Sequence, residues 1–446
     1  MDPGSLRARD DSTKCCARDD STTLVRLNFM GRAPQNKPTN MKIIGRIPPI
    51  LMYLLVSLST LTETIYSAAL PDIAEKLHTS GGIAQLSTTA YYCGFAIGIF
   101  TLGRVSDIFG RKPVVLFGIS FYAICALLIS YSPNIETFIA LRFLQAYGAS
   151  VGSVVGQAMT RDSYKGWELS YMYASVAMVM AVVPSVGSAI GGYIVEYSGW
   201  QTVFRFLTIL ATALLLIYIR FLPETNAYIG VARNNRFFSV LKVALKDKVL
   251  LSYSFIVGSF NGICFGFYIQ APFIFIDSLK MSPSNYGKLF LALSGANLIG
   301  SLISRRLIKK FVNTFKVKII GLAFSIVGCI MLAVGAMMIN ETSTVNAVAL
   351  LIFVPMTVHL MGHSLVVPML LRHALEDYFK VTGSAGAIFG SLYYMITAAV
   401  SFMISSLHSD DINNFSILFG ILLTICLALF YMTTRWRKTM HKPEFY

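Results

Sequence analysis

Two ionisable residues of opposite charge stand inside long apolar runs of this chain. Glu63 lies in the run 47–69 and Arg142 in the run 134–158. A charged side chain is costly in an apolar environment, so each needs a functional or structural reason. A carboxyl group near a guanidinium can be switched by protonation or by a cationic ligand, which suits proton coupling. A permanent structural salt bridge is the alternative, since the sequence does not show that the two residues touch.

The two residues are expected at the same depth. Glu63 precedes Pro71, the expected outer end of the first run, by eight residues, and Arg142 follows Asn134 by eight residues. With about 1.5 Å of rise per residue, each lies roughly 12 Å from the outer end of its helix. Apart from Glu136, at the very start of the run 134–158, Glu63 is also the only acid within the apolar runs. It is therefore the expected proton acceptor, with Arg142 as its electrostatic partner.

The composition predicts a polytopic membrane protein. Of the 446 residues, 55% are hydrophobic and only 13% are charged, and the mean hydropathy is +0.63. Soluble proteins average about 25% charged residues. The formal net charge of +15 would suggest nucleic acid as a partner in a soluble chain, but the basic residues lie in short loops between apolar runs. They are better explained by membrane orientation, so the expected partner is the lipid bilayer and not nucleic acid.

Twelve apolar runs are long enough to cross a bilayer, which takes about 20 residues. They are 47–69, 82–102, 113–131, 134–158, 169–194, 200–222, 249–276, 285–305, 316–339, 344–371, 383–406 and 412–433. Basic residues gather in the loops of one side, which places both termini and the central linker in the cytoplasm. The predicted segments are a disordered polar N-terminal tail (1–40), an N-terminal six-helix bundle (41–222), a cytoplasmic linker (223–248), a C-terminal six-helix bundle (249–434) and a cytoplasmic tail (435–446).

A short charged turn joins the second and third runs. Its sequence, GRVSDIFGRKP, has the spacing Gly-x-x-x-Asp-x-x-Gly-Arg-Lys, formed by Gly103, Asp107, Gly110, Arg111 and Lys112. The glycines allow close backbone approach or positive φ, while the aspartate accepts hydrogen bonds and the arginine supplies a planar fork of donors. This spacing resembles the loop signature between helices 2 and 3 of the major facilitator superfamily. The simpler alternative is a basic loop that only fixes orientation.

Two further motifs resemble those of the drug/proton antiporters in that superfamily. LRFLQAYG is similar to the helix 4 motif, whose arginine is implicated in proton transfer, and it contributes Arg142 and Gln145. VPSVGSAIGGY is similar to the helix 5 motif, which is matched by Pro184, Gly187, Gly191 and Gly192. Ser188 stands where that family usually has proline. Close helix packing by small residues is the alternative explanation of the second motif.

Several stretches resemble the Bcr/CflA-type drug-resistance subfamily. They are GWQTVFRFL from Gly199, LPET from Leu222 and FYIQAPFIF from Phe267. One departure concerns the first helix, where Thr64 occupies the position of the usual aspartate and Glu63 is its neighbour, rotated by about 100°. Either Glu63 serves the same cavity from a shifted angle or the coupling differs.

The resemblance implies two six-helix bundles, related by pseudo-two-fold symmetry, around a central cavity. By analogy, the loop from Gly103 to Lys112 latches the cytoplasmic side, with Asp107 and Arg111 contacting neighbouring helix ends. Polar residues within the apolar runs are the candidates for lining the cavity, namely Tyr66, Tyr91, Gln145, Asn261, Tyr268 and Asn297. Helix packing is the alternative for each. His359 and His363, one turn apart, suit proton transfer, metal binding or a purely structural role.

The expected function is secondary active transport, namely proton-coupled export of small amphiphilic molecules or drugs by alternating access. The sequence contains no nucleotide-binding loop and no catalytic constellation, so neither an ATP-driven pump nor an enzyme is expected. The seven cysteines have no recurring ligand spacing, so no metal or other cofactor is expected. A carrier of one defined metabolite, such as a siderophore or a nutrient, is the main alternative, and a membrane sensor is a remote one. The expected form is a monomer in the bacterial inner membrane.

Overall fold

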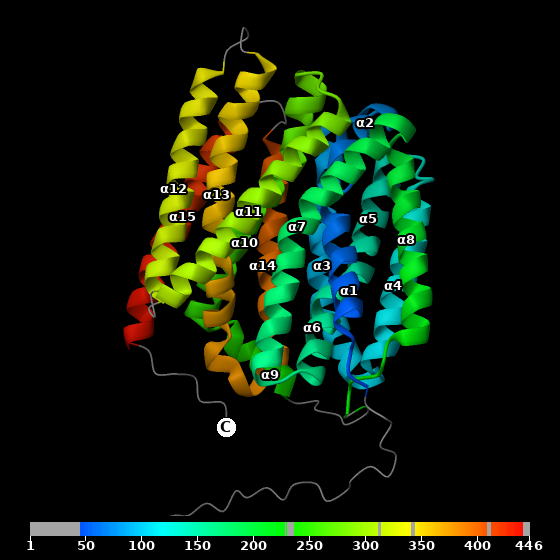
Figure 1. Ribbon diagram of the computed structural model, residues 1–446, viewed down its shortest axis with the longest axis vertical. Coiled ribbons are helices and arrows are strands. Elements are labelled where there is room, and N and C mark those ends of the chain that lie inside the picture. Colours follow the sequence, from blue (N-terminus) through cyan, green and yellow to red (C-terminus); the bar gives the residue numbers. More distant parts are fainter. Residues whose placement is uncertain are drawn as a thin grey trace, which may run out of the picture. The chain divides into compact units, whose positions relative to one another are not determined.

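The computed structural model describes residues 45–227, 229, 236–310, 314–339, 344–407 and 412–439. Within this part of the chain every regular element is helical, and twelve helical segments are long and apolar enough to cross a membrane (Figure 1). The expected all-α integral membrane fold with twelve spans is therefore confirmed. The expected N-terminal tail, 1–40, lies outside the described residues.

The first six spans run from residue 49 to residue 221. They are formed by α1 (Pro49–Thr64) with α2 (Leu70–Lys76), α3 (Gly81–Phe109), α4 (Arg111–Ile129), α5 (Ile135–Ala149) with α6 (Val151–Ser163), α7 (Gly166–Ser198) and α8 (Trp200–Phe221). A short helix, α9 (Arg236–Ala244), lies in the stretch that connects them to the second half.

The last six spans run from residue 248 to residue 436. They are formed by α10 (Lys248–Pro272) with the π-helical turn η2 (Phe273–Ser278), α11 (Pro283–Lys310), α12 (Thr314–Met338), α13 (Val345–Ala374) with the 3-10 turn η3 (Glu376–Val381), α14 (Thr382–Ser406) and α15 (Ile412–Thr439). Because α15 continues to Thr439, the first residues of the expected tail 435–446 are helical, and 440–446 lie outside the described residues.

Local sequence signals explain where several helices begin. Ser80, Asn134 and Thr344 each precede a helix, and their side chains accept a hydrogen bond from the backbone N–H three residues later. Asp247 accepts two such bonds, from Val249 and Leu250. These polar caps satisfy backbone donors that have no partner within the helix.

The first span differs from the expected run 47–69. α1 ends at Thr64, a 3-10 turn covers Ser67–Ala69, and Pro71 lies in the first turn of α2. Proline is tolerated there because the N–H groups of the first helical turn have no partner within the helix. Pro71 therefore begins a helix instead of ending one, and Glu63 lies in the last turn of α1, next to the break.

The linker also differs from its sequence-based description. The stretch 223–248 was expected only to be polar and basic, yet it contains the helix α9, with Phe237, Val240 and Ala244 buried. The aromatic ring of Phe237 lies 5.3 Å from that of Phe100 in α3. This spacing of apolar residues gives α9 one face that packs against the spans.

In the described part of the chain, the most extensive contacts between the two halves are those of α3 with α14 and of α7 with α11. Small residues line both contacts: Gly103 faces Ala387 and Gly390 faces Ile99, while Gly287 faces Ala189. Close helix approach needs such residues, because a larger side chain would force the backbones apart. Below, the α2 end and the α9 end denote the opposite ends of the bundles marked by those helices (Figure 1).

Candidate functional site

Glu63 is a buried carboxyl group that contacts the second half of the chain. Its exposed fraction is 6%, and the hydroxyl of Tyr394 in α14 donates a hydrogen bond to Oε1 at 3.4 Å. The Tyr394 ring lies 4.6 Å from that of Phe95 and 6.2 Å from that of Tyr92, both in α3. The carboxyl group thus lies next to a set of aromatic rings at the contact between α3 and α14.

Arg142 is fully buried between aromatic rings of the first half. Its guanidinium carbon lies 3.9 Å from the ring centre of Tyr66 and 4.5 Å from that of Tyr91, and Nη1 donates to Oε1 of Gln145 at 2.7 Å. Stacking on aromatic faces suits the planar guanidinium. Nε and Nη2 of Arg142 and Nε2 of Gln145 have no hydrogen-bond partner in the described part of the chain. Three buried donors therefore remain available at this place.

Glu63 and Arg142 are neighbours without forming an ion pair. The described residues contain no ion pair within 4.0 Å between them. A row of tyrosine rings connects the two residues. The Tyr91 ring contacts Arg142 and lies 5.9 Å from the ring of Tyr92. Tyr92 in turn lies beside Tyr394, the residue that donates to Glu63. The alternative of a permanent salt bridge does not describe this conformation.

Thr64 contacts α7 while its neighbour Glu63 contacts α14. The Thr64 hydroxyl donates to the backbone oxygen of Pro184 at 2.8 Å, and the Ser188 hydroxyl donates to the backbone oxygen of Thr64 at 3.4 Å. Thr64 and Ser188 are the two positions that depart from the antiporter pattern. No sequence pattern links these two positions, but the structure places them in contact.

The helix 5 motif forms the contact surface of α7. A Cβ atom at Gly187 would lie 2.8 Å from Oγ1 of Thr64, and one at Gly191 would collide with the backbone oxygen of Ile65. A Cβ atom at Gly192 would collide with the backbone of Pro283 in α11. The motif therefore packs α7 against α1 on one side and against the second half on the other.

The six predicted cavity residues divide into two groups. Tyr66, Tyr91 and Gln145 surround Arg142 and are fully buried. The other three belong to the second half. The Tyr268 hydroxyl lies 3.3 Å from that of Ser185 in α7, the amide nitrogen of Asn297 donates to the backbone oxygen of Ala181 at 3.4 Å, and Asn261 contacts His363. Asn261 and Asn297 are only half-buried.

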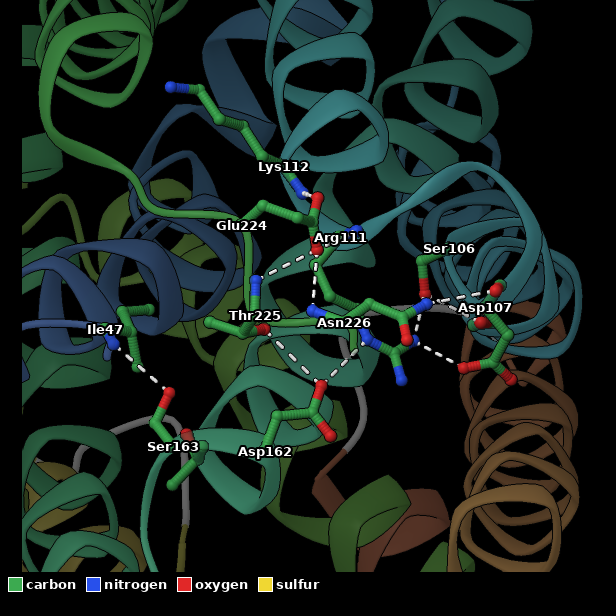
Figure 2. A network of polar contacts seen from close by, with 12 residues as sticks. Ile47, Ser106, Asp107, Arg111, Lys112, Asp162, Ser163, Glu224, Thr225 and Asn226 are labelled. Atoms are coloured by element: carbon green, nitrogen blue, oxygen red, sulfur yellow. Dashed lines mark hydrogen bonds and ion pairs between the residues drawn. The ribbon is translucent and has the colours of Figure 1, made fainter. Parts of the chain in front are cut away.

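The predicted loop motif forms a network at the α9 end (Figure 2). Arg111 Nη1 lies 2.6 Å from Oδ1 of Asp107, and its Nε lies 3.2 Å from Oδ2 of Asp162 at the end of α6. The Arg111 side chain is 10% exposed, whereas that of Asp107 is 62% exposed. Gly110 has φ of 100°, which explains the need for glycine between α3 and α4.

Glu224 completes this network, although sequence analysis did not single it out. Its two carboxylate oxygens accept from the backbone N–H groups of Arg111 and Lys112, each at 3.0 Å, and Oε1 also accepts from those of Thr225 and Asn226 (Figure 2). An acidic side chain at a helix N-terminus is stabilised by the unpaired N–H groups there. In the sequence, the LPET stretch that contains Glu224 carries only a family resemblance.

Comparisons with known proteins give relatives for nearly the whole chain. An uncharacterized transporter of Rickettsia bellii is 51% identical over 393 residues, which are 88% of this chain and 97% of that protein. Multidrug resistance protein D of Escherichia coli is 25% identical, over 84% and 94% of the two chains. A chloramphenicol resistance protein of Pseudomonas aeruginosa is 27% identical, over 78% and 81%.

The fold and the family agree with these relatives. The crystal structure of a D-xylose-proton symporter matches with a TM-score of 0.68 at 14% identity, covering 86% of this chain and 95% of that one, which shows a shared fold. Residues 52–401 match the family model described as Major Facilitator Superfamily. The chain therefore belongs to the Major Facilitator Superfamily and is a multi-pass membrane transporter, not an enzyme.

Proposed function

We propose that this transporter exports small amphiphilic molecules in exchange for protons. The observation that carries the proposal is the buried carboxyl group of Glu63, which receives a hydrogen bond from Tyr394 of the opposite half. Burial makes a charged carboxylate costly, so the group favours either a bound proton or a bound cation. Exchange of one for the other at Glu63 couples proton entry to release of the transported molecule.

Arg142 is the electrostatic partner of Glu63 in this cycle. The Arg142 guanidinium stays protonated, so it does not bind the transported proton itself. Its Nε and Nη2 atoms are donors without a partner in the described part of the chain, and they can stabilise a negative charge that develops nearby. When Glu63 loses its proton, the carboxylate is stabilised by the fixed positive charge of Arg142, which is held against the Tyr91 ring. The stacked tyrosines hold the guanidinium in place throughout.

Alternating access then requires the two halves to rock about the contacts α3–α14 and α7–α11. The loop network at Arg111 ties the α3–α4 turn to α6 and to the LPET stretch, so the first half moves as one body. In the proposed arrangement, the bundles 41–222 and 249–434 are the two bodies that rock. The α9 end and both termini face the cytoplasm. The transporter works as a monomer in the bacterial inner membrane.

Export of drugs is supported by distant relatives that are named as resistance proteins. A carrier of one defined metabolite is the second candidate. The contact between Thr64 and Ser188 favours it, because both residues depart from the antiporter pattern and together they form one polar contact in place of an acid and a proline.

The test is transport in proteoliposomes with an imposed pH gradient. Export driven by the gradient should be seen for several unrelated amphiphilic compounds with the wild-type protein and be lost in Glu63→Gln. Saturable transport of one compound only would favour the metabolite carrier. Transport of the same compounds at the same rate by Glu63→Gln would contradict proton coupling at this residue.

A further inference from the structure

A pocket lies at the α9 end, where the two halves meet. Its walls come from α3, the start of α4 and α6 in the first half and from the first turns of α14 in the second, and Phe237 of α9 adds to the lining. The empty space is about 380 Å³, part of which is open to solvent. The ionisable residues of the lining are Arg104, Asp107, Arg111 and Arg161. The pocket is therefore mainly basic and borders both halves.

The surroundings of the pocket carry an excess of positive charge. Arg111 pairs with Asp107 at 2.6 Å and with Asp162, which lies outside the lining, at 3.2 Å. Three lining arginines and these two aspartates leave one positive charge. Glu224, which accepts from the N–H groups of Arg111 and Lys112, is balanced by the charge of Lys112. An anion is therefore attracted to this place.

Arg161 on α6 and Arg104 on α3 supply this charge. Arg161 is half-buried, its Nη1 donates to the Tyr173 hydroxyl at 3.4 Å, and within the described residues it forms no ion pair. The guanidinium carbon of Arg104 lies 5.4 Å from the ring centre of Phe237 and 5.0 Å from that of Phe238. Contacts with aromatic rings hold a guanidinium in place without neutralising its charge.

The opposite wall of the pocket is the N-terminus of α14. Val381 precedes this helix without giving a side-chain cap, and no side chain in the described part of the chain bonds to the N–H groups of Gly383 or Ser384. A Cβ atom at Gly383 would meet nothing within 4 Å, so there is room in front of these groups. Asp107 lines the pocket, but its Oδ1 binds Arg111. Gly383 and Ser384 therefore present the positive end of the helix dipole to the pocket.

We propose that this pocket binds a phosphate group that bridges the two halves. A phosphate group has oxygen atoms in several directions, so it can accept from Arg104 and Arg161 on one wall and from the first turn of α14 on the other. The planar fork of arginine donors matches phosphate geometry. The group belongs either to the head of an anionic phospholipid or to a soluble phosphate compound. The inference does not depend on what Glu63 binds.

Bridging has a consequence for the transport cycle. One wall of the pocket moves with the first half and the other with the second, so the two walls separate when the halves open at the α9 end. A bound phosphate group therefore stabilises the conformation that is closed at this end, because it has both sets of donors only there.

The test measures the melting temperature of the purified full chain in dodecyl maltoside, a detergent without phosphate. Potassium phosphate is titrated against potassium chloride at the same ionic strength, which controls for charge screening. In a second arm, dioleoylphosphatidylglycerol is titrated against dioleoylglycerol, which has the same acyl chains and no phosphate. Phosphate, phosphatidylglycerol or both should raise the melting temperature in a saturable way, and the two controls should not.

Two variants and a control locate the binding site. Arg161→Gln should raise the Kd of the phosphate probe about tenfold, as expected for loss of a hydrogen bond between charged groups. Ser384→Asp should abolish the saturable rise, because a carboxylate then occupies the wall of the pocket. This variant should still fold, since an acidic residue in the first turn suits a helix. Arg205→Gln should behave as the wild type, because Arg205 is exposed beside Tyr131 and is not part of the lining.

Distances between spin labels on α3 and α14 test the bridge itself. The phosphate probe that binds should increase the population closed at the α9 end in the wild type and not in Ser384→Asp. A response to inorganic phosphate assigns the site to soluble phosphate compounds, and a response to phosphatidylglycerol alone assigns it to a lipid head group. A response to neither probe, an equal response to the controls, or unchanged binding in both pocket variants would overturn the inference. Binding without any change in the distances would overturn the bridge.

Discussion

The hydroxyl of Tyr394 donates a hydrogen bond to the carboxyl group of Glu63 across a sequence separation of 331 residues. The bond joins α1 of the first half to α14 of the second, beside the contact between α3 and α14. A rocking motion of the two halves must lengthen or break it. Protonation of one carboxyl group and the movement of two bundles are thereby linked through a single contact.

Removing the Tyr394 hydroxyl should weaken this conformation without unfolding the protein. In Tyr394→Phe the ring packing on Phe95 and Tyr92 remains, while a hydrogen bond of about 1 kcal/mol is lost. The ratio of the described conformation to the one in which the two halves have rocked and the Tyr394–Glu63 bond is broken should fall about fivefold. Distances between spin labels on α3 and α14 would measure the shift. Tyr92→Phe, which keeps the same ring contacts, is the control and should leave the populations as in the wild type.

Replacing Arg142 by lysine should destabilise the first half although the charge is kept. Lysine cannot stack on Tyr66 and Tyr91 while donating to Gln145, so the free energy of unfolding should fall by about 2 kcal/mol. Transport should fall with it. Chemical unfolding of the purified protein measures the first effect. Arg205→Lys is the control, because Arg205 is exposed and lies 5.6 Å from the Tyr131 ring; equal losses in both variants would argue against the stacking contribution.

Glu224→Ala should destabilise the loop network. The substitution leaves the N–H groups of Arg111 and Lys112 without their carboxylate acceptor, at a cost of about 1–2 kcal/mol. The thermal unfolding temperature should drop accordingly. Glu136→Ala is the matched control, since Glu136 is exposed in the first turn of α5, where Asn134 already provides the cap, and about 0.3 kcal/mol is expected there. An unchanged melting temperature in Glu224→Ala would remove the capping role.

Gly192→Ala should favour separation of the two halves at the α2 end. The new methyl group on α7 would collide with the backbone of Pro283 in α11. A Cβ atom at Gly295, which lies in α11 itself, would meet nothing within 4 Å. Cysteines introduced near the α2 end should become more reactive toward a water-soluble thiol reagent in Gly192→Ala and not in Gly295→Ala. Equal labelling in both variants would show that this contact does not control the opening.

The fold was largely predictable from sequence because its signals are local. Runs of apolar residues predict the spans. Within the Gly103–Lys112 turn, Gly110 marks the boundary between two helices, and its φ is positive in the structure. The break after Thr64 was not predictable from the first run alone. Pro71 is compatible with both the end of one helix and the start of the next, and packing decides between them.

The candidate site was only partly predictable, because its contacts join distant segments. Helical spacing places Gln145 beside Arg142, and this contact follows from local sequence. The hydrogen bond from Tyr394 to Glu63 and the contact between Ser188 and Thr64 depend on how α14 and α7 pack against α1. No local pattern marks Tyr394 among the 22 tyrosines of the chain.

The central claim is that Glu63 exchanges a proton for the transported molecule. The most direct test is proton release from the purified protein in weakly buffered solution when an amphiphilic cation is added. The account predicts release in the wild type, none in Glu63→Gln, and retained release in Glu136→Gln. Binding of the cation without proton release in the wild type, or the same release in Glu63→Gln, would contradict proton coupling at this carboxyl group.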